Sequence, residues 1–349
     1  MPRHKIKING VKFYNNIVVS PMCQYSSQNG CPTEWHYHHL RNLIETGAGS
    51  LIIESTAVSK IGRITNNDMC LYNIRHLNAH SKLIKYLKKI RNIPIIIQLS
   101  HSGRKGSAEI PFYKKNIPLK GKHAWKTFGP SNISRDANWP KPLEMKISDI
   151  KKVIKQFEYS SCLAFKAGYD GVEIHMAHGY LLHQFCSPIS NKRSDVYGLN
   201  DSKYEVHKKI IRSIKNILPK KKLIGARVTG DDHLPKGIKT KDCINLLDIL
   251  KKEGLNYACI SSGGIIPKTN MEFCPGYRLK MSNYIKKNSK VLIRTSGLIN
   301  NHKILKKADK LLDLIAIGRK LVNDKYFLIK DKKYKNLVVT PKQYKYCID

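Results

Sequence analysis

The chain has 349 residues, a length that fits two average domains or one α/β barrel. Its 41% hydrophobic and 8% aromatic content excludes a disordered protein, and no apolar run approaches the roughly 18 residues of a membrane span, so we expect a cytoplasmic protein with no membrane partner. The net charge of +38 comes mostly from Lys, because only 13 of the 63 basic residues are Arg, and it predicts a solvated basic surface rather than a nucleic-acid partner.

The first predicted element is a small hairpin over residues 5–16, which turns at Asn9-Gly10 because this dipeptide suits a two-residue β-turn. Eight short apolar runs follow it along the chain. Their apolarity is continuous rather than alternating, which predicts strands buried on both faces of a parallel sheet. The runs are Ile17–Val19, Leu51–Ile53, Pro94–Leu99, Gly171–Ile174, Leu223–Val228, Tyr257–Ile260, Val291–Ile293 and Leu314–Ile317.

Longer segments with helical periodicity separate these runs. One helix is expected to start at Ser148, a suitable N-cap residue, and to end near Ala167 with Gly168 as its stop. The other expected helices lie near residues 34–45, 79–90, 203–218, 240–253 and 302–307.

Strands that alternate with helices predict an α/β protein with a single (β/α)₈ TIM barrel, whose floor the N-terminal hairpin plugs. A doubly wound sheet is the rival, but it normally carries G-x-G-x-x-G after its first strand, and that motif is absent. We expect one domain over residues 1–349, with the barrel core at about 15–325 and a C-terminal tail at about 326–349. A long excursion after the third strand, residues 104–146, is predicted to be a functional lid.

The nine cysteines are odd in number, irregularly spaced and without a Cys-x-x-Cys pair. This usage fits a reducing compartment and offers no zinc-ribbon or iron–sulfur framework, so we expect no metal. The run His36-Tyr37-His38-His39 suggests a metal site at first sight. On a helix these side chains point in different directions, so we interpret them as structural or surface residues.

Polar or glycine residues follow nearly every predicted strand. Barrel active sites lie at the C-terminal ends of the strands, so these residues predict a ring of side chains around one site. After the last two strands come Ser296, Gly297, Gly318 and Arg319. Small residues there let backbone N–H groups approach a phosphate, and Arg319 can neutralise it, as in the usual barrel phosphate site.

His175, His178 and Tyr180 follow the fourth strand. Two imidazoles could bind a metal, but a third ligand would have to come from elsewhere, and the helical i, i+4 spacing of a zinc protease is absent. As hydrogen-bond donors, the two imidazoles could instead hold a substrate oxygen and stabilise the charge that grows there during hydride addition, with Tyr180 as general acid. A pair of core histidines is the other alternative, and we do not favour it directly after a buried strand.

Eight segments of the chain resemble the old yellow enzyme family, specifically its cysteine-bearing bacterial branch. They occur in order between about residues 5 and 325, and the fourth is long and highly specific. The segments are SPMCQYS (20–26), GRIT (62–65), IQLSHSGRK (97–105), EIHMAHGYLLHQFCSPISNKRSDVYG (173–198), ARV (226–228), SSGG (261–264), SGLI (296–299) and IGRKLVND (317–324).

The resemblance implies an FMN-dependent ene-reductase. It would use NADPH or NADH to reduce activated C=C bonds of α,β-unsaturated carbonyl or nitro compounds. His175 and His178 would bind the substrate's oxygen, Tyr180 would donate the proton, and Tyr25 would contact the substrate. The residues implied to bind FMN are Ser20, Pro21, Cys23, Ala57, Gln98, Arg227, Ser296, Gly297, Gly318 and Arg319.

Within that set the resemblance gives several residues separate tasks. Cys23 would modulate the flavin's potential, Gln98 would contact the pyrimidine edge of the ring, and Arg227 would lie near its N1 and O2. At the C-terminus, Tyr346 stands where relatives place an Arg or Trp that reaches a neighbouring subunit. The sequence therefore allows either a homodimer or a homotetramer, and it does not decide whether two subunits share a site.

An RNA-modifying flavoprotein of the dihydrouridine synthase type is the alternative function, and it would give the positive charge a purpose. Asn29-Gly30-Cys31-Pro32 is similar to a loop of that family. However, that loop should follow a later strand, and roughly 25 residues after the barrel leave no room for an RNA-binding helical domain. A dienoyl-CoA reductase with an iron–sulfur cluster would need a tight Cys triplet, which is absent.

Overall fold

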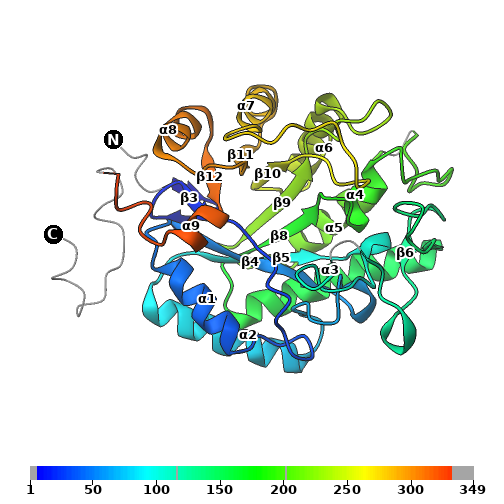
Figure 1. The fold of residues 1–349 in the computed structure, drawn as a ribbon, viewed down its shortest axis with the longest axis horizontal. Coiled ribbons are helices and arrows are strands. Elements are labelled where there is room, and N and C mark those ends of the chain that lie inside the picture. Colours follow the sequence, from blue (N-terminus) through cyan, green and yellow to red (C-terminus); the bar gives the residue numbers. More distant parts are fainter. Residues whose placement is uncertain (1–5, 115–116, 201–202, 332–349) are drawn as a thin grey trace.

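The computed structural model describes residues 6–114, 117–200 and 203–331. Eight parallel strands form a closed barrel in the order β10-β11-β12-β3-β4-β5-β8-β9, which confirms the predicted (β/α)₈ barrel (Figure 1). All eight apolar runs of the sequence fall on these strands. The strands are β3 (Ile17–Val19), β4 (Ser50–Ala57), β5 (Ile95–Ser100), β8 (Gly171–Met176), β9 (Leu223–Thr229), β10 (Tyr257–Ser261), β11 (Leu292–Thr295) and β12 (Leu314–Ile317).

Helices surround the barrel and cover its outer face (Figure 1). Apolar side chains from the strands and from the inner faces of the helices form one continuous core between the two layers. The α-helices are α1 (Glu34–Ile44), α2 (Ile74–Ile90), α3 (Ile147–Ala167), α4 (Leu181–Cys186), α5 (Glu205–Asn216), α6 (Thr240–Lys252), α7 (Leu279–Asn288), α8 (His302–Leu311) and α9 (Arg319–Asn323).

Two predicted helix starts were wrong. α3 begins one residue before Ser148, because the Asp149 carboxylate accepts the Lys146 backbone N–H at 2.9 Å and so makes Lys146 the N-cap. α2 begins five residues earlier than expected, because Asn73 caps it by accepting the His76 backbone N–H at 2.9 Å. The stop at Gly168 is confirmed: this residue has a φ of 97°, in the left-handed region that favours glycine.

The N-terminal hairpin closes the bottom of the barrel, as predicted. Its strands β1 (Ile6–Ile8) and β2 (Val11–Phe13) pair antiparallel, and Asn9 and Gly10 between them both have positive φ. The buried Phe13 belongs to an apolar cluster with Val18 and Leu314, close to the N-terminal ends of their strands. This end of the barrel is therefore filled with side chains, which leaves the opposite end for a site.

A buried charged group lies inside the barrel. The Glu173 carboxylate on β8 accepts hydrogen bonds from Gln98 Nε2 at 2.8 Å, Tyr257 OH at 3.0 Å and Arg294 Nη2 at 2.6 Å. Glu173 and Arg294 are 0% and 1% exposed, so the two charges compensate each other away from water. Gly225 makes room for this group, because a Cβ there would lie 2.1 Å from Tyr257 Cζ.

The excursion after β5 contains the short strands β6 (Phe128–Gly129) and β7 (Leu143–Glu144). Arg104, which is 1% exposed, donates from its guanidinium to the carbonyl oxygens of Ile133, Ser134 and Ile265 at 2.9–3.2 Å. This guanidinium therefore ties the excursion to the loop that follows β10. No helix of the described residues is both long and apolar enough to cross a membrane.

Candidate functional site

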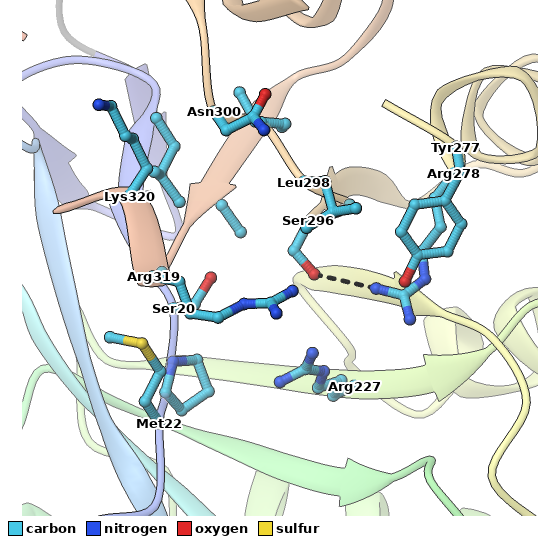
Figure 2. A pocket seen from close by; sticks show the side chains of 16 residues that line it. Ser20, Met22, Arg227, Tyr277, Arg278, Ser296, Leu298, Asn300, Arg319 and Lys320 are labelled. Carbon is cyan, nitrogen blue, oxygen red and sulfur yellow. Dashed lines mark hydrogen bonds between the residues drawn. The ribbon is translucent and has the colours of Figure 1, made fainter. Parts of the chain in front are cut away.

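A cavity of about 290 Å³ lies at the C-terminal ends of β3, β9, β11 and β12 (Figure 2). The strand ends meet closely here: a Cβ on Gly318 would lie only 3.1 Å from Met22 Sδ. Seven of the ten residues that the sequence assigned to the cofactor line this cavity. They are Ser20, Pro21, Arg227, Ser296, Gly297, Gly318 and Arg319.

Three guanidinium groups line the cavity, those of Arg227, Arg278 and Arg319 (Figure 2). Among the described residues, none of the three forms an ion pair with a carboxylate. The cavity is therefore strongly electropositive and suited to an anionic ligand. Sequence reasoning missed Arg278, because it belongs to the loop after β10 rather than to a strand end.

Two buried polar atoms at the cavity have no hydrogen-bond partner among the residues that the structure describes. They are Ser20 Oγ and Arg227 Nε. Buried polar groups are rarely left unsatisfied in native proteins, so each is expected to meet a ligand. Together with the three guanidinium groups, these atoms fit a ligand that carries both a phosphate and a polar ring, as FMN does.

His175, His178 and Tyr180 come together as the sequence predicted. The His175 ring centroid lies 5.1 Å from that of His178 and 4.8 Å from that of Tyr180. His175 belongs to β8, and the loop after it carries His178 and Tyr180. This loop packs against the loop after β10, since a Cβ on Gly179 would lie 2.2 Å from the Gly264 carbonyl oxygen. His178 and Gly179 have φ values of 58° and 74°, so this turn is left-handed.

Hydrogen bonds fix the tautomer of His175. Its Nδ1 accepts the Ala177 backbone N–H at 3.2 Å, so the neutral ring carries its proton on Nε2. His178 Nε2 lies 2.5 Å from Ser261 Oγ. If the Ser261 hydroxyl donates this bond, the proton of His178 is on Nδ1.

Both imidazoles are held in the neutral form. Burial, followed by the positive charge of Arg227, lowers the pKa of His175 and of His178 well below 6.5. Burial also raises the pKa of Tyr180, with a smaller contribution from Cys23, so its phenol keeps its proton. The group therefore offers neutral donors and one phenolic proton at physiological pH.

An apolar wall borders this group. Tyr25 and Tyr180 pack against a buried cluster of Ile64, Ala108 and Trp139. Trp139 comes from the excursion after β5, so the predicted lid contributes directly to the wall. Burial raises the pKa of the Tyr25 phenol, which keeps its proton as well.

Lys105 is a second residue that sequence reasoning gave no role. Its Nζ donates to the His178 backbone carbonyl at 2.6 Å and lies 5.0 Å from the centroid of the Tyr180 ring. Burial, followed by Arg135 and Arg104, lowers the pKa of Lys105 to about 7. This side chain therefore holds the loop that carries His178 in place.

Cys23, Ala57 and Gln98 do not line the cavity, although the sequence assigned them to the cofactor. Ala57 ends β4, and Gln98 on β5 directs its Nε2 to Glu173 inside the barrel. Burial, followed by the charges of Glu54 and Asp68, raises the pKa of the Cys23 thiol. Cys23 is thus a protonated thiol rather than an activated nucleophile.

The histidine run on α1 is structural at its first member, as interpreted from the sequence. His36 is buried, and its Nε2 lies 3.4 Å from Glu54 Oε1. Among the described residues, no group of three or more His, Cys, Asp or Glu side chains could hold a metal ion. Tyr346 lies outside the described residues.

A (β/α)₈ barrel with a cationic cavity and a histidine–tyrosine group at its C-terminal end defines an enzyme that binds a phosphorylated cofactor. The family model of the NADH:flavin oxidoreductase / NADH oxidase family matches residues 4–337. The chain is 34% identical over 338 residues to an NADPH dehydrogenase of Clostridium acetobutylicum, which covers 95% of this chain and 94% of that protein. The chain therefore belongs to the NADH:flavin oxidoreductase / NADH oxidase family.

Solved structures agree on the fold. An old yellow enzyme homologue from Zymomonas mobilis matches with a TM-score of 0.75 at 18% identity, over 96% of this chain and 93% of that one. A 2-naphthoyl-CoA reductase matches with a TM-score of 0.84 at 20% identity, over 95% of this chain and 52% of that one. The family model and the NADPH dehydrogenase relative confirm the resemblance that the sequence segments indicated, and the protein is an NAD(P)H-dependent flavin oxidoreductase with FMN as its cofactor.

Proposed function

We propose that this flavin oxidoreductase is an ene-reductase that reduces activated C=C bonds of α,β-unsaturated carbonyl or nitro compounds. The observation that carries the proposal is the neutral pair His175 and His178, with the Tyr180 phenol 4.8 Å from His175 between ring centroids. Two uncharged donors suit an oxygen that becomes negative only as the reaction proceeds.

The cofactor would lie along the cavity and the neighbouring strand ends. When bound, FMN would supply the hydride chemistry between NADPH or NADH and the substrate's β-carbon. Arg227 would face the flavin ring, where its charge would stabilise added electrons. The remaining residues that we propose to hold FMN are Ser20, Pro21, Cys23, Ala57, Gln98, Ser296, Gly297, Gly318 and Arg319.

The histidine pair would bind the carbonyl or nitro oxygen and polarise the C=C bond. The fixed tautomer of His175 presents Nε2–H as one donor. His178 presents Nδ1–H as the other when Ser261 donates to its Nε2. Because both rings are already neutral, no proton has to leave them before the substrate binds.

Tyr180 would deliver the proton that completes the reduction. Hydride reaches the β-carbon, the phenolic proton goes to the α-carbon, and the phenolate regains a proton from solvent. The elevated pKa of Tyr180 keeps the proton available until charge develops on the substrate. Tyr25 packs against the same apolar cluster as Tyr180 and would contact the substrate through its ring and its hydroxyl group.

The first test removes both donors with His175→Ala and His178→Ala. We expect turnover of cyclohexenone to be lost while FMN stays bound, because the cationic cavity is untouched. His175→Asn with His178→Asn keeps amide donors and should retain part of the activity. The exposed His123→Ala serves as control. Near-normal rates in the double alanine variant would contradict the proposed oxygen-binding pair.

The second test is Tyr180→Phe. We expect slower enone reduction with flavin reduction by NADPH largely kept, because only the second half of the cycle needs the proton. Stopped-flow measurement of each half-reaction separates the two, and the exposed Tyr14→Phe is the matched control. Loss of the flavin-reduction half instead would refute the proton-donor role.

The RNA-modifying alternative is not favoured, and it can be tested with the same preparation. A yellow protein that shifts tRNA on a gel and does not reduce enones would support it.

We further propose that the protein is cytoplasmic and consists of a single domain. Its cysteine usage and the described elements, which build one barrel or pack on it, support this proposal. Light scattering of the wild type measures whether the protein forms a homodimer or a homotetramer. The same measurement on Tyr346→Ala tests whether Tyr346 contributes to the contact between subunits.

A further inference from the structure

Arg278 is a buried cation whose purpose the proposed set of FMN ligands does not explain. Its side chain lines the cavity, on the far side from Arg319 and Lys320 in Figure 2. It is only 8% exposed. A guanidinium so far removed from water carries a large desolvation cost unless an anion compensates its charge.

The partners of Arg278 are neutral. Its Nε donates to Ser262 Oγ at 2.8 Å, its Nη1 donates to Ser296 Oγ at 3.3 Å, and its guanidinium lies 4.6 Å from the ring centroid of Tyr277. Among the described residues, no carboxylate forms an ion pair with it. These contacts aim the guanidinium but leave its charge uncompensated.

Arg104 shows what a structural arginine looks like in the same protein. Its guanidinium donates to the backbone carbonyl oxygens of Ile133, Ser134 and Ile265, which are strong acceptors, and Arg104 holds two loops together. Arg278 reaches two hydroxyl groups instead, and one of them, on Ser296, belongs to the lining of the cavity. Its place in the fold is therefore that of a ligand-binding group.

We propose that Arg278 is a second ligand of the cofactor phosphate, which it binds as a dianion together with Arg319, and that this pair makes the protein selective for FMN over riboflavin. The inference rests on the proposed binding of FMN in this cavity. A phosphate near neutral pH carries close to two negative charges, and two guanidinium groups match them. Arg227 is then left for the flavin ring.

Electrostatics within the cavity agree with this assignment. Burial lowers the pKa of Arg278 to about 10, and the neighbouring charges of Arg227 and Arg319 act in the same direction. Arg278, whose charge is disfavoured by both burial and its two cationic neighbours, therefore gains from an anion placed in the cavity. The Ser296 hydroxyl would be the neutral partner that keeps Arg278 oriented toward that anion.

The test compares the two flavins in the full-length protein. Flavin is removed by dialysis, and binding of FMN and of riboflavin is followed by quenching of flavin fluorescence. For Arg278→Gln we expect FMN affinity to fall about 10- to 100-fold, the range of a charge-assisted hydrogen bond, with riboflavin affinity unchanged. Arg278→Lys keeps the positive charge but lacks the planar guanidinium, so its affinity for FMN should lie between those of the wild type and Arg278→Gln. The exposed Arg212→Gln is the control.

Two outcomes would overturn the proposal. FMN affinity equal to wild type in Arg278→Gln would show that the phosphate does not need this residue. Equal losses for FMN and riboflavin would show that Arg278 supports the cavity structurally instead of binding the phosphate. Riboflavin binding reports in the same titration whether the variant is folded.

Enone turnover at saturating FMN separates this inference from the proposed activity. A protein that binds FMN through Arg278 but leaves enones unreduced would refute the ene-reductase assignment alone. A protein that reduces enones and binds FMN equally well without Arg278 would refute only the phosphate assignment.

Discussion

The buried histidines predict that the protein loses stability steeply below pH 6.5. Burial lowers the pKa of His80 to about 3 and the pKa of His101 and His207 to about 4. In an unfolded chain each imidazole titrates near 6.5, so between pH 6.5 and 4 the unfolded state binds more protons. The stabilisation is therefore fully present above pH 6.5 and is lost as the pH falls through that value.

The size of the effect follows from these shifts. Between pH 7.5 and pH 5, each histidine that stays neutral in the fold lowers the free energy of unfolding by about 2 kcal/mol, so the three together remove about 6 kcal/mol. Asp68 acts in the opposite direction, because burial raises its pKa to about 6, and it restores roughly 1 kcal/mol. These four groups alone therefore give a net loss of about 5 kcal/mol, which is a large part of a typical total stability. His175 and His178, whose pKa burial also lowers well below 6.5, act in the same direction as the three histidines.

Urea titrations followed by circular dichroism between pH 8 and pH 5 measure this loss. His80→Asn tests its origin, because the Asn oxygen can still accept from the Tyr169 hydroxyl, which lies 2.7 Å from His80 Nδ1. The variant should lose about 2 kcal/mol less than wild type over this pH range. The exposed His123→Asn should behave as wild type. An unfolding midpoint that does not change with pH, or a pH dependence equal in His80→Asn and wild type, would refute the reasoning.

Three further predictions concern the barrel interior and the reaction. Glu173→Gln leaves the buried Arg294 cation uncompensated and should lower the free energy of unfolding, measured in urea, by about 3–5 kcal/mol. Adding Arg294→Met to this variant should recover part of the lost stability. A loss below about 1 kcal/mol in Glu173→Gln would contradict the buried ion pair. Gly225→Ala places a Cβ 2.1 Å from Tyr257 Cζ and should lower the free energy of unfolding by about 1–3 kcal/mol. An unchanged urea midpoint would show that the Tyr257 ring can move away freely. The rate of flavin reoxidation by enone should not fall as the pH rises from 5.5 to 6.5, because the histidine pair is already neutral, Tyr180 is protonated, and Lys105, with a pKa lowered to about 7, still holds most of its proton. A rate that falls over this range would mean that the pair acts as imidazolium.

The barrel could be predicted because its strands are buried on both faces. Such strands leave continuous apolar runs, and all eight were found in the sequence. α7 could not be found in this way, since only Leu279, Ser282 and Ile285 of its ten residues are buried and most of the remainder is polar. The start of α3 was wrong for a different reason. Ser148 suits the N-cap position, but the Asp149 carboxylate accepts the Lys146 backbone N–H, and Lys146 becomes the N-cap.

The site was predictable where it depends on strand ends and unpredictable where it depends on loops. Ser296, Gly318 and Arg319 follow directly from the register of the last two strands. Arg278 lies 17 residues beyond the end of β10, so no strand register could place it. Glu173 does leave a signal in the sequence, because a carboxylate within a continuous apolar run needs a buried partner. Arg294, which directly follows another such run, supplies it.

Burial serves opposite electrostatic purposes at the two halves of the site. At the cavity, arginines cannot give up their protons, so burial leaves strong cations that only an anion can compensate. At the histidine–tyrosine group, the same low polarity removes charge instead, because an imidazole can respond by losing its proton. Arg227 connects the halves: it pairs in register with His175 on the adjacent strand and lines the cavity as well. Its fixed charge is thus one reason why the neighbouring imidazoles stay neutral: the arginine on β9 is a permanent cation, whereas the histidine on β8 responds to burial by losing its charge.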